Sequence, residues 1–335
     1  MKKLIAILCA VCLVFALCAC GESEAPAQEN ANAPADAPAK ADKAEKLTFT
    51  TGGDTGTYYA YGSVLAQYVN QKAGLNVTAV VGNGSQANVE DLNAGDVQLA
   101  FCQSDVMIYA YSGTNLFAQS GAMDSFSTVA ALYMEQVQIV TMNSEIKTVA
   151  DLKGKTVSIG VSGSGVYFNA LDVLGAYGLT EEDIKPVYQN FGDSAESLKD
   201  GKIDTAFIVA GAPTNAITDL STSGQVYLVS IDDEHIDALL EASPYYTKNV
   251  IAADTYGLPE DAQTVAVGAV ILVRDDVSED AVYSFVSAIF ENEGDIQHGK
   301  AEELDVNFAA SITDVPYHPG AAKYFGEKGL DVPVK

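Results

Sequence analysis

The sequence predicts an α/β protein of two lobes, with a central ligand cleft between the lobes and crossing strands that join them. From Leu47 onward, short β-rich runs alternate with helical stretches, which is typical of an α/β sheet. A small-residue turn that opens a helix occurs twice, at residues 51–59 and 160–165. A helix, a Gly stop and an apolar strand also recur, at residues 92–101 and 198–207. Two lobes built alike can turn their helix starts toward one another and so form a cleft.

The strands and helices follow from hydrophobic periodicity. Tyr61, Leu65, Tyr68 and Val69 fall on one face at helical spacing, which predicts an amphipathic helix after the first turn. Expected strands cover residues 47–51, 77–81, 97–101, 156–160, 203–209 and 226–231. Helices are expected to start near Thr57, Gln86, Asp105, Val166, Asp193 and Pro213.

Two longer apolar runs, residues 136–142 and 264–274, are candidate strands that cross between the lobes. They place residues 47–143 and 262–335 in the first lobe and residues 144–261 in the second. Residues 282–290 are expected to form a helix on the first lobe. A chain of 335 residues is long enough for two such lobes.

The N-terminus predicts a signal for export. Lys2 and Lys3 precede an apolar run from Leu4 to Ala19, which is shorter than the roughly 20 residues of a membrane-spanning helix. The end of this run resembles the lipobox of bacterial lipoproteins, with Cys20 as the residue that would be lipidated. An uncleaved anchor or a plain secretory signal is the alternative. Residues 1–19 would then be the signal peptide and residues 20–46, rich in Ala, Pro and acids, a disordered tether to the membrane.

Charge and cysteine content limit the possible functions. The formal net charge of −27 argues against nucleic acid as a partner, because binding to phosphates needs a basic surface. Outside the signal region Cys102 is the one cysteine, so we expect no internal disulfide and a buried thiol. Arg274 is the one arginine in the chain.

Small and polar residues lie at five junctions where an expected strand ends and a helix begins. The first amides of a helix are unpaired donors with partial positive charge, and Gly lets a ligand approach them. Such junctions predict a site for an anion without a cationic side chain; ordinary turns and helix caps are the alternative for each one. They lie at residues 52–57, 82–86, 103–105, 162–165 and 211–214, and contribute the candidates Thr57, Asp105, Gly165 and Gly211.

Aromatic residues are further candidates for the cleft. Tyr58, Tyr59, Tyr133 and Tyr167 could line it and offer hydroxyl groups, with core packing as the alternative.

The sequence motifs of common catalytic sites are incomplete or absent. Gly154-Lys155-Thr156 lacks the Gly that a phosphate-binding loop needs at position 149, which is Val. The sequence contains no Gly-x-Ser-x-Gly elbow, and its three histidines have no metal-ligand spacing. We therefore expect no enzyme activity, no cofactor and no metal.

A series of motifs resembles the TAXI receptors of TRAP transporters. The order matches from about Leu47 to Leu330. The motifs are Thr51-Gly-Gly-x-x-Gly-Thr-Tyr-Tyr59, Gly84-Ser-x-x-Asn88, Leu92-x-x-Gly95, Gln103-Ser-Asp105, Asp151-Leu-Lys-Gly-Lys155, Gly163-Ser-Gly165, Gly201-Lys-Ile-Asp204, Ala210-Gly-Ala-Pro213 and His318-Pro-Gly-Ala321.

This resemblance implies a type II periplasmic-binding-protein fold and a monomeric receptor on the extracytoplasmic face of the cell membrane. It would capture a small carboxylate, such as glutamate or a 2-oxo-dicarboxylate, and deliver it to TRAP permease subunits. Asp54, where many relatives carry Pro or Gly, adds a carboxylate that favours a ligand with an amino group. The ligand contacts that the resemblance implies are Gly53, Tyr58, Tyr59, Ser85, Asn88, Gln103, Ser162, Ser164 and Pro213.

Two other functions stay open at this point. The same fold could serve as a sensory receptor for a membrane kinase. Less expected is an extracytoplasmic enzyme on the same scaffold, which would need a nucleophile–base pair or a metal.

Overall fold

The computed structural model describes residues 45–335, in which ten strands form a single mixed sheet. The order along the sheet is β2-β1-β3-β10-β4-β7-β5-β6, while β8 pairs with β4 and β9 with β10. The strands are β1 (Lys46–Thr50), β2 (Asn76–Val80), β3 (Leu99–Gln103), β4 (Phe126–Thr141), β5 (Thr156–Ser158), β6 (Lys185–Val187), β7 (Thr205–Ala210), β8 (Tyr227–Leu228), β9 (Thr247–Ile251) and β10 (Ala262–Arg274).

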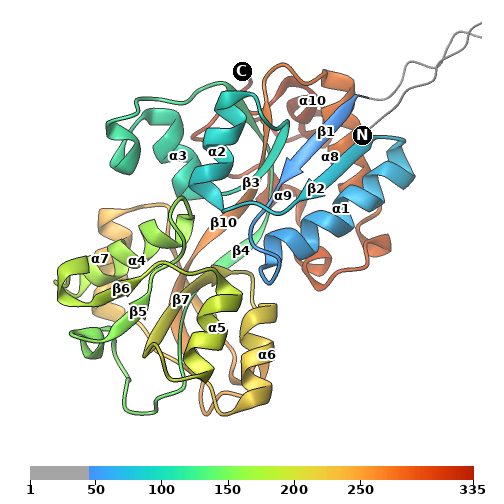
Figure 1. Ribbon diagram of the computed structural model, residues 1–335. Helices are drawn as coiled ribbons and strands as arrows, with labels where there is room; N and C mark the ends of the chain where they lie inside the picture. Colours follow the sequence, from blue (N-terminus) through green and yellow to red (C-terminus); the bar gives the residue numbers. More distant parts are fainter. Residues whose placement is uncertain (1–44) are drawn as a thin grey trace, which may run out of the picture. The chain divides into compact units, whose positions relative to one another are not determined.

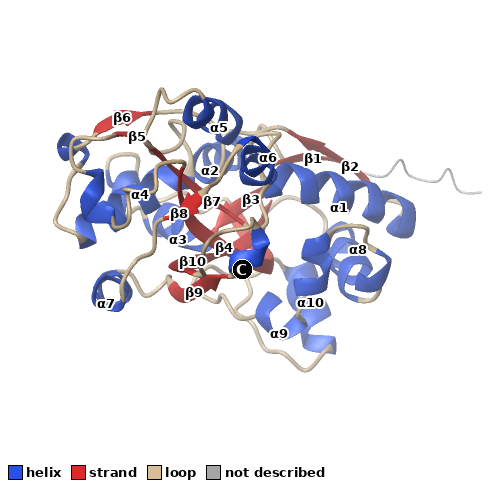
Figure 2. Cartoon of the chain, turned by 90° about the horizontal axis from the view of Figure 1, so that it is seen from below, coloured by secondary structure: helices blue, strands red, loops and turns tan. Residues whose placement is uncertain are grey.

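Helices cover both faces of this sheet (Figures 1 and 2). The α-helices are α1 (Thr57–Ala73), α2 (Ser85–Ala94), α3 (Ser104–Ser112), α4 (Gly165–Ala176), α5 (Phe191–Lys199), α6 (Asn215–Ser223), α7 (Asp233–Ala242), α8 (Glu279–Phe290), α9 (Val306–Ala309) and α10 (Pro319–Glu327). Short 3-10 helices include η6 (Gly299–Glu303).

Strands β4 and β10 are long, antiparallel to one another, and run through both halves of the sheet (Figure 1). On one side of this pair β10 is hydrogen-bonded to β3, and on the other side β4 is hydrogen-bonded to β7. The two strands therefore connect the two halves of the sheet. These are the expected crossing strands. Strand β4 begins ten residues before the expected start at 136, because its first half is buried on both faces and shows no alternation to mark a strand.

The buried apolar residues divide into two lobes, each with a core on both faces of its part of the sheet. In the first lobe, Ile271 packs under α1, α8 and α10, and its neighbour Leu272 packs under α2 and α3. In the second lobe, Val209 packs under α4 and α7, and its neighbour Ile208 packs under α5 and α6. Successive side chains of a strand point to opposite faces, so each lobe is a helix–sheet–helix sandwich.

The fold class expected from the sequence is confirmed: the protein is α/β, with two lobes joined by crossing strands. The helix expected near Pro213 starts at Asn215, and the strand expected at 226–231 shrinks to Tyr227–Leu228. The exact lobe boundaries at 143/144 and 261/262 stay a prediction. The signal peptide, Cys20 and the tether, apart from its last residues, lie outside the described part of the chain.

Buried Cys102 packs in the first-lobe core, as expected. No helix within residues 45–335 is both long and apolar enough to cross a bilayer.

Candidate functional site

A cavity of about 350 Å³ lies between the two lobes. Three segments of the first lobe line it: the β1–α1 loop, the β2–α2 loop, and Gln103 at the end of β3. The second lobe contributes the β5–α4 loop, the β6–α5 loop and the end of β7. Glu135, in the middle of the crossing strand β4, completes the lining. Except for Glu135, these groups follow the carboxyl ends of strands, where α/β sheets bind ligands. The volume suits a small metabolite.

Three helices begin at this cavity without a side-chain cap, although the Ala87 amide in the first turn of α2 donates to Gly163 O of the second lobe at 2.9 Å. The residues before α1, α2 and α4 are Gly56, Gly84 and Ser164, and none of them gives a side-chain cap in the described structure. Helix α5, which also starts at the cavity, is capped by the Asn190 side chain. Uncapped amides at the positive end of a helix dipole favour a bound anion.

The two glycine-rich loops approach each other closely. A Cβ added to Gly165 of the second lobe would lie 1.7 Å from Gln103 Oε1 and 2.9 Å from Ser85 Oγ, both in the first lobe. A Cβ on Gly84 would lie 3.3 Å from Ser164 Cα. Only glycine fits at position 165 with the lobes at this separation.

Hydrogen bonds join the lobes around the cavity. Asn169 of α4 is the central residue: its Oδ1 accepts from Gln103 Nε2 at 2.9 Å, and its Nδ2 donates to Asp105 Oδ2 at 2.9 Å. Elsewhere Thr57 Oγ1 donates to Gly211 O at 3.0 Å, and Lys300 Nζ of η6 donates to Ala212 O at 2.7 Å. The lobes are therefore in contact, as in a closed receptor.

Five buried polar atoms among the cavity-lining side chains have no hydrogen-bond partner within residues 45–335. They are Tyr58 Oη, Ser164 Oγ, Gln103 Oε1, Glu135 Oε1 and Gln189 Oε1. Burial raises the pKa of Tyr58 well above its ordinary value, so its hydroxyl keeps its proton and can donate. The Ser164 hydroxyl can also donate, whereas Gln103 Oε1 accepts.

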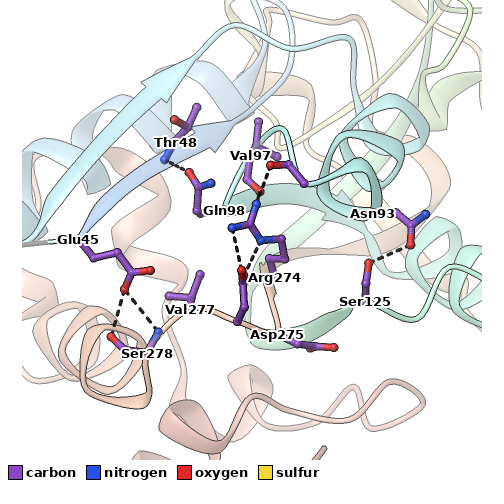
Figure 3. A network of polar contacts seen from close by, with 12 residues as sticks. Glu45, Thr48, Asn93, Val97, Gln98, Ser125, Arg274, Asp275, Val277 and Ser278 are labelled. Carbon is purple, nitrogen blue, oxygen red and sulfur yellow. Dashed lines mark hydrogen bonds and ion pairs between the residues drawn. The ribbon is translucent and has the colours of Figure 1, made fainter.

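Electrostatically, the lining contains acids but no bases within the described chain. Its titratable carboxyl groups belong to Asp54 and Glu135, and no lysine, arginine or histidine is among the lining residues. Arg274 lies away from the cavity, at the end of β10. There it pairs with Asp276 and donates to the carbonyls of Gly95 and Val97 (Figure 3). The prediction that an anion would be held without a cationic side chain is consistent with this arrangement.

The structure brings half of the predicted site residues together at the cavity. Those that line it are Gly53, Thr57, Tyr58, Ser85, Gln103, Ser164 and Gly165. Those that do not are Tyr59, Asn88, Asp105, Tyr133, Ser162, Gly211 and Pro213.

Several of the seven predicted residues that do not line the cavity have structural contacts elsewhere in the protein. Asn88 is fully buried; its Nδ2 donates to Thr51 O and Phe101 O, and its Oδ1 accepts from Thr50. Tyr133 is buried against Lys300 and Tyr61, as the core-packing alternative proposed.

Asp105 and Gly211 support the site indirectly, through bonds to Asn169 and Thr57. Ser162 and Pro213 are exposed to solvent, and Tyr59 is half-buried. Tyr167, another aromatic candidate, donates to Glu181 instead of lining the cavity.

Sequence reasoning missed Glu135 and the β6–α5 loop, residues 189–191. A lone acid inside the apolar run of β4 was a usable signal, but the strand was expected to begin one residue later. Strand β6 has only three residues, too few for a pattern to reveal the loop behind it.

No group of three or more His, Cys, Asp or Glu side chains in residues 45–335 is arranged to hold a metal ion.

Together, the two sandwich lobes, the crossing strands and the cavity between them define a two-lobed periplasmic-binding-protein fold. Residues 49–329 match the profile of the NMT1-like family, so the chain belongs to that family.

Solved structures with a similar fold include a protein from Bordetella bronchiseptica RB50, with a TM-score of 0.51 at 15% identity, covering 85% of this chain and 81% of that one. The periplasmic aliphatic sulphonate binding protein SsuA from Escherichia coli is 19% identical, with a TM-score of 0.44 over 84% of this chain and 83% of that one. The alkanesulfonate-binding protein SsuA from Xanthomonas axonopodis pv. citri, bound to MOPS, is 18% identical, with a TM-score of 0.48 and the same coverage.

Proposed function

We propose that this protein is an extracytoplasmic solute-binding receptor that captures a small organic anion between its lobes and delivers it to a membrane transporter. One observation carries the proposal: the interlobe cavity is lined by three helix N-termini without side-chain caps and by two unpaired hydroxyl groups, and its lining includes no cationic side chain. The two-lobed fold and membership of the NMT1-like family support it.

The strength of such a site is sufficient for a receptor. A hydrogen bond to a charged group contributes roughly 1.5–3 kcal/mol, and several of them, less the ordering costs, reach the roughly 8 kcal/mol of a micromolar complex. The surrounding acidic surface opposes an anion only weakly, because physiological salt screens charge over about 8 Å.

The finer details of the proposal are a carboxylate ligand, a TRAP permease as the partner, and a lipid anchor at Cys20. They rest on the motif series that resembles the TAXI receptors and on the lipobox-like end of the apolar run. A neighbouring gene for a permease of the TRAP type would support the partner, whereas a neighbouring kinase sensor gene would favour signalling.

The site is tested by calorimetric titration of the purified protein against mono- and dicarboxylates. Gly53 has nothing within 4 Å of an added Cβ, so the Gly53→Val side chain should occupy open space in the cavity. Ser164→Ala removes an unpaired donor. We expect the double variant to lose binding at least 100-fold with an unchanged melting temperature.

Ser162→Ala is the matched control, because Ser162 lies in the same loop but is exposed and does not line the cavity. Its affinity should equal that of the wild type. Unchanged affinity in the double variant would show that the site lies elsewhere, and a turnover assay with any bound acid separates a receptor from an enzyme.

A further inference from the structure

Glu135 is a buried acid at the cavity, and its carboxyl forms no ion pair with any residue in the described range 45–335. It lies in the middle of β4, opposite Val267 of β10, and its side chain is 1% exposed. It lines the cavity, and its Oε1 has no hydrogen-bond partner in the described chain. A buried carboxylate is costly unless it is paired, so an arrangement of this kind needs an explanation.

Lys300, the basic residue whose charge acts on the Glu135 carboxyl, already has other partners. Its Nζ donates to Ala212 O at 2.7 Å and pairs with Glu303. Burial raises the pKa of Glu135 well above its ordinary value and nearby Asp105 raises it further, whereas Tyr58, Gln103 and Lys300 lower it. The environment of the cavity therefore disfavours the ionised carboxyl until a positive charge arrives.

A second unpaired acceptor lies beside Glu135. Gln103 Nε2 is occupied by Asn169 Oδ1, which leaves Gln103 Oε1 without a partner. Within residues 45–335, Glu135 Oε1 and Gln103 Oε1 are acceptors without a hydrogen-bond partner. They match a ligand group that brings several N–H donors and a positive charge, which an ammonium group does.

The charge balance of the cavity points the same way. A ligand with only negative groups would leave the Glu135 carboxyl protonated, because the lining residues include no base to offset a second negative charge beside it. A ligand with both charges can place its carboxylate among the donors, namely the helix N-termini, Tyr58 and Ser164, and its amino group at the acceptors.

We propose that Glu135 and Gln103 Oε1 receive the ammonium group of the ligand, so that the receptor binds small amino acids in their zwitterionic form. This inference rests on the proposed function and narrows its substrate class. Glu135 is a specificity-determining residue, because it distinguishes an amino acid from the same acid without the amino group.

The experiment titrates the full chain with each of the 20 protein amino acids, and with the 2-oxo acid and the des-amino acid of the same carbon skeleton. L-Glutamate, 2-oxoglutarate and glutarate form one such series. We expect the best amino acid to bind about 30-fold or more tighter than its des-amino analogue.

Glu135→Gln should weaken binding of that amino acid by about 30-fold and leave the des-amino acid within about 3-fold of the wild type. Glu90→Gln is the matched control: Glu90 is exposed on α2, and the substitution removes the same charge far from the lining. It should leave every affinity unchanged. If a variant has a lowered melting temperature, the relative affinities of the wild type for these ligands still test the inference.

The outcomes separate the two proposals. Binding of acids without preference for the amino group overturns the inference and leaves the receptor function in place. The same holds for a Glu135→Gln variant that keeps the preference. Binding of no acid of either kind overturns the receptor function and the inference together.

Discussion

Two buried amide side chains of the first lobe, Asn88 and Gln103, differ in how far their polar atoms are paired. Asn88 donates twice, to Thr51 O and Phe101 O, and accepts from Thr50. Gln103 donates to Asn169 across the lobes, but its Oε1 has no partner within residues 45–335. The motif series implied a ligand contact for both. The difference teaches that a saturated buried amide stabilises its own lobe, whereas an unsaturated one at the cavity is available to a ligand.

A second saturated amide lies on the part of the crossing strand β4 that pairs with β7 of the second lobe. Gln138 on β4 donates to Ala210 O at 3.1 Å and to Thr214 Oγ1 at 2.8 Å, and it accepts from Tyr256 at 2.6 Å. Both ends of the sheet therefore contain a buried amide whose polar atoms are all paired, whereas other polar atoms at the cavity lining are unpaired.

The largest effect is expected where a saturated group is removed. Asn88→Ala breaks three buried hydrogen bonds and strands two backbone carbonyls, at about 1–3 kcal/mol each. We expect the free energy of unfolding to fall by about 4 kcal/mol, measured by urea denaturation. A loss below about 1 kcal/mol would show that Asn88 is not a structural residue.

The next effect concerns the fit between the lobes. Gly165→Ala places a methyl group against Gln103 and Ser85, so the lobes cannot close around a ligand. We expect a loss of about 100-fold in affinity for the best-binding acid, with the melting temperature of the free protein unchanged. Gly175→Ala, on the same helix with nothing within 4 Å of the added Cβ, is the control and should bind normally. Equal affinities for the two variants would contradict the closed arrangement.

A smaller effect follows from the titration of Asp105. Burial raises its pKa from 3.8 to about 7 in the folded protein, although a hydrogen bond from the Val106 backbone amide lowers it. Nearby Asp172 raises this pKa further, and a hydrogen bond from Asn169 lowers it. Between pH 3.8 and about pH 7, the Asp105 carboxyl is therefore protonated in the folded protein and ionised in the unfolded chain. The stability from this proton is complete below about pH 4 and is lost as the pH rises to about 7.

Asp105→Asn removes this titration. Relative to the wild type, the variant should gain about 2 kcal/mol of unfolding free energy between pH 5 and pH 7, measured by urea denaturation at both values. Tyr246 and Asp172 face the same network through Asn169 and stay unchanged in the variant. A stability difference that does not vary with pH would refute the assignment.

The smallest effect is expected at Arg274, whose partners are all structural (Figure 3). Arg274→Lys keeps the charge but loses the paired contact with Asp276, which is worth about 1 kcal/mol or less near the surface. Affinity for every acid should equal that of the wild type, by calorimetry. A weaker affinity would mean that the arginine acts on the ligand after all.

Much of the fold could be predicted from local patterns. The helix starts near Thr57, Val166 and Asp193 lie within two residues of those observed, because a glycine- or asparagine-containing turn before an apolar stripe defines them. Helix α7 escaped prediction although Asp232 caps it, and β9 is an exposed strand without clear alternation.

The site was predicted less completely than the fold. Gly53, Tyr58 and Ser164 were found because they lie in the duplicated turns. Asn88 and Ser85 lie in one motif on one helix, yet only Ser85 lines the cavity, because Asn88 points to the strand carbonyls behind it. Glu135 was missed because an acid in an apolar run has no meaning until its surroundings are known.

By itself the sequence determined the alternation of strands and helices, the two glycine-rich turns, and the scarcity of basic residues that could hold an anion. These depend on neighbours within a few turns of the chain. Only the tertiary structure decided which polar atoms are satisfied. The partner of Gln103 is 66 residues away, and the carboxyl of Glu135 acquires its unpaired, buried setting only when β4 crosses between two closed lobes. Hydrogen bonding and desolvation act over a few ångströms in space, whatever the separation along the chain.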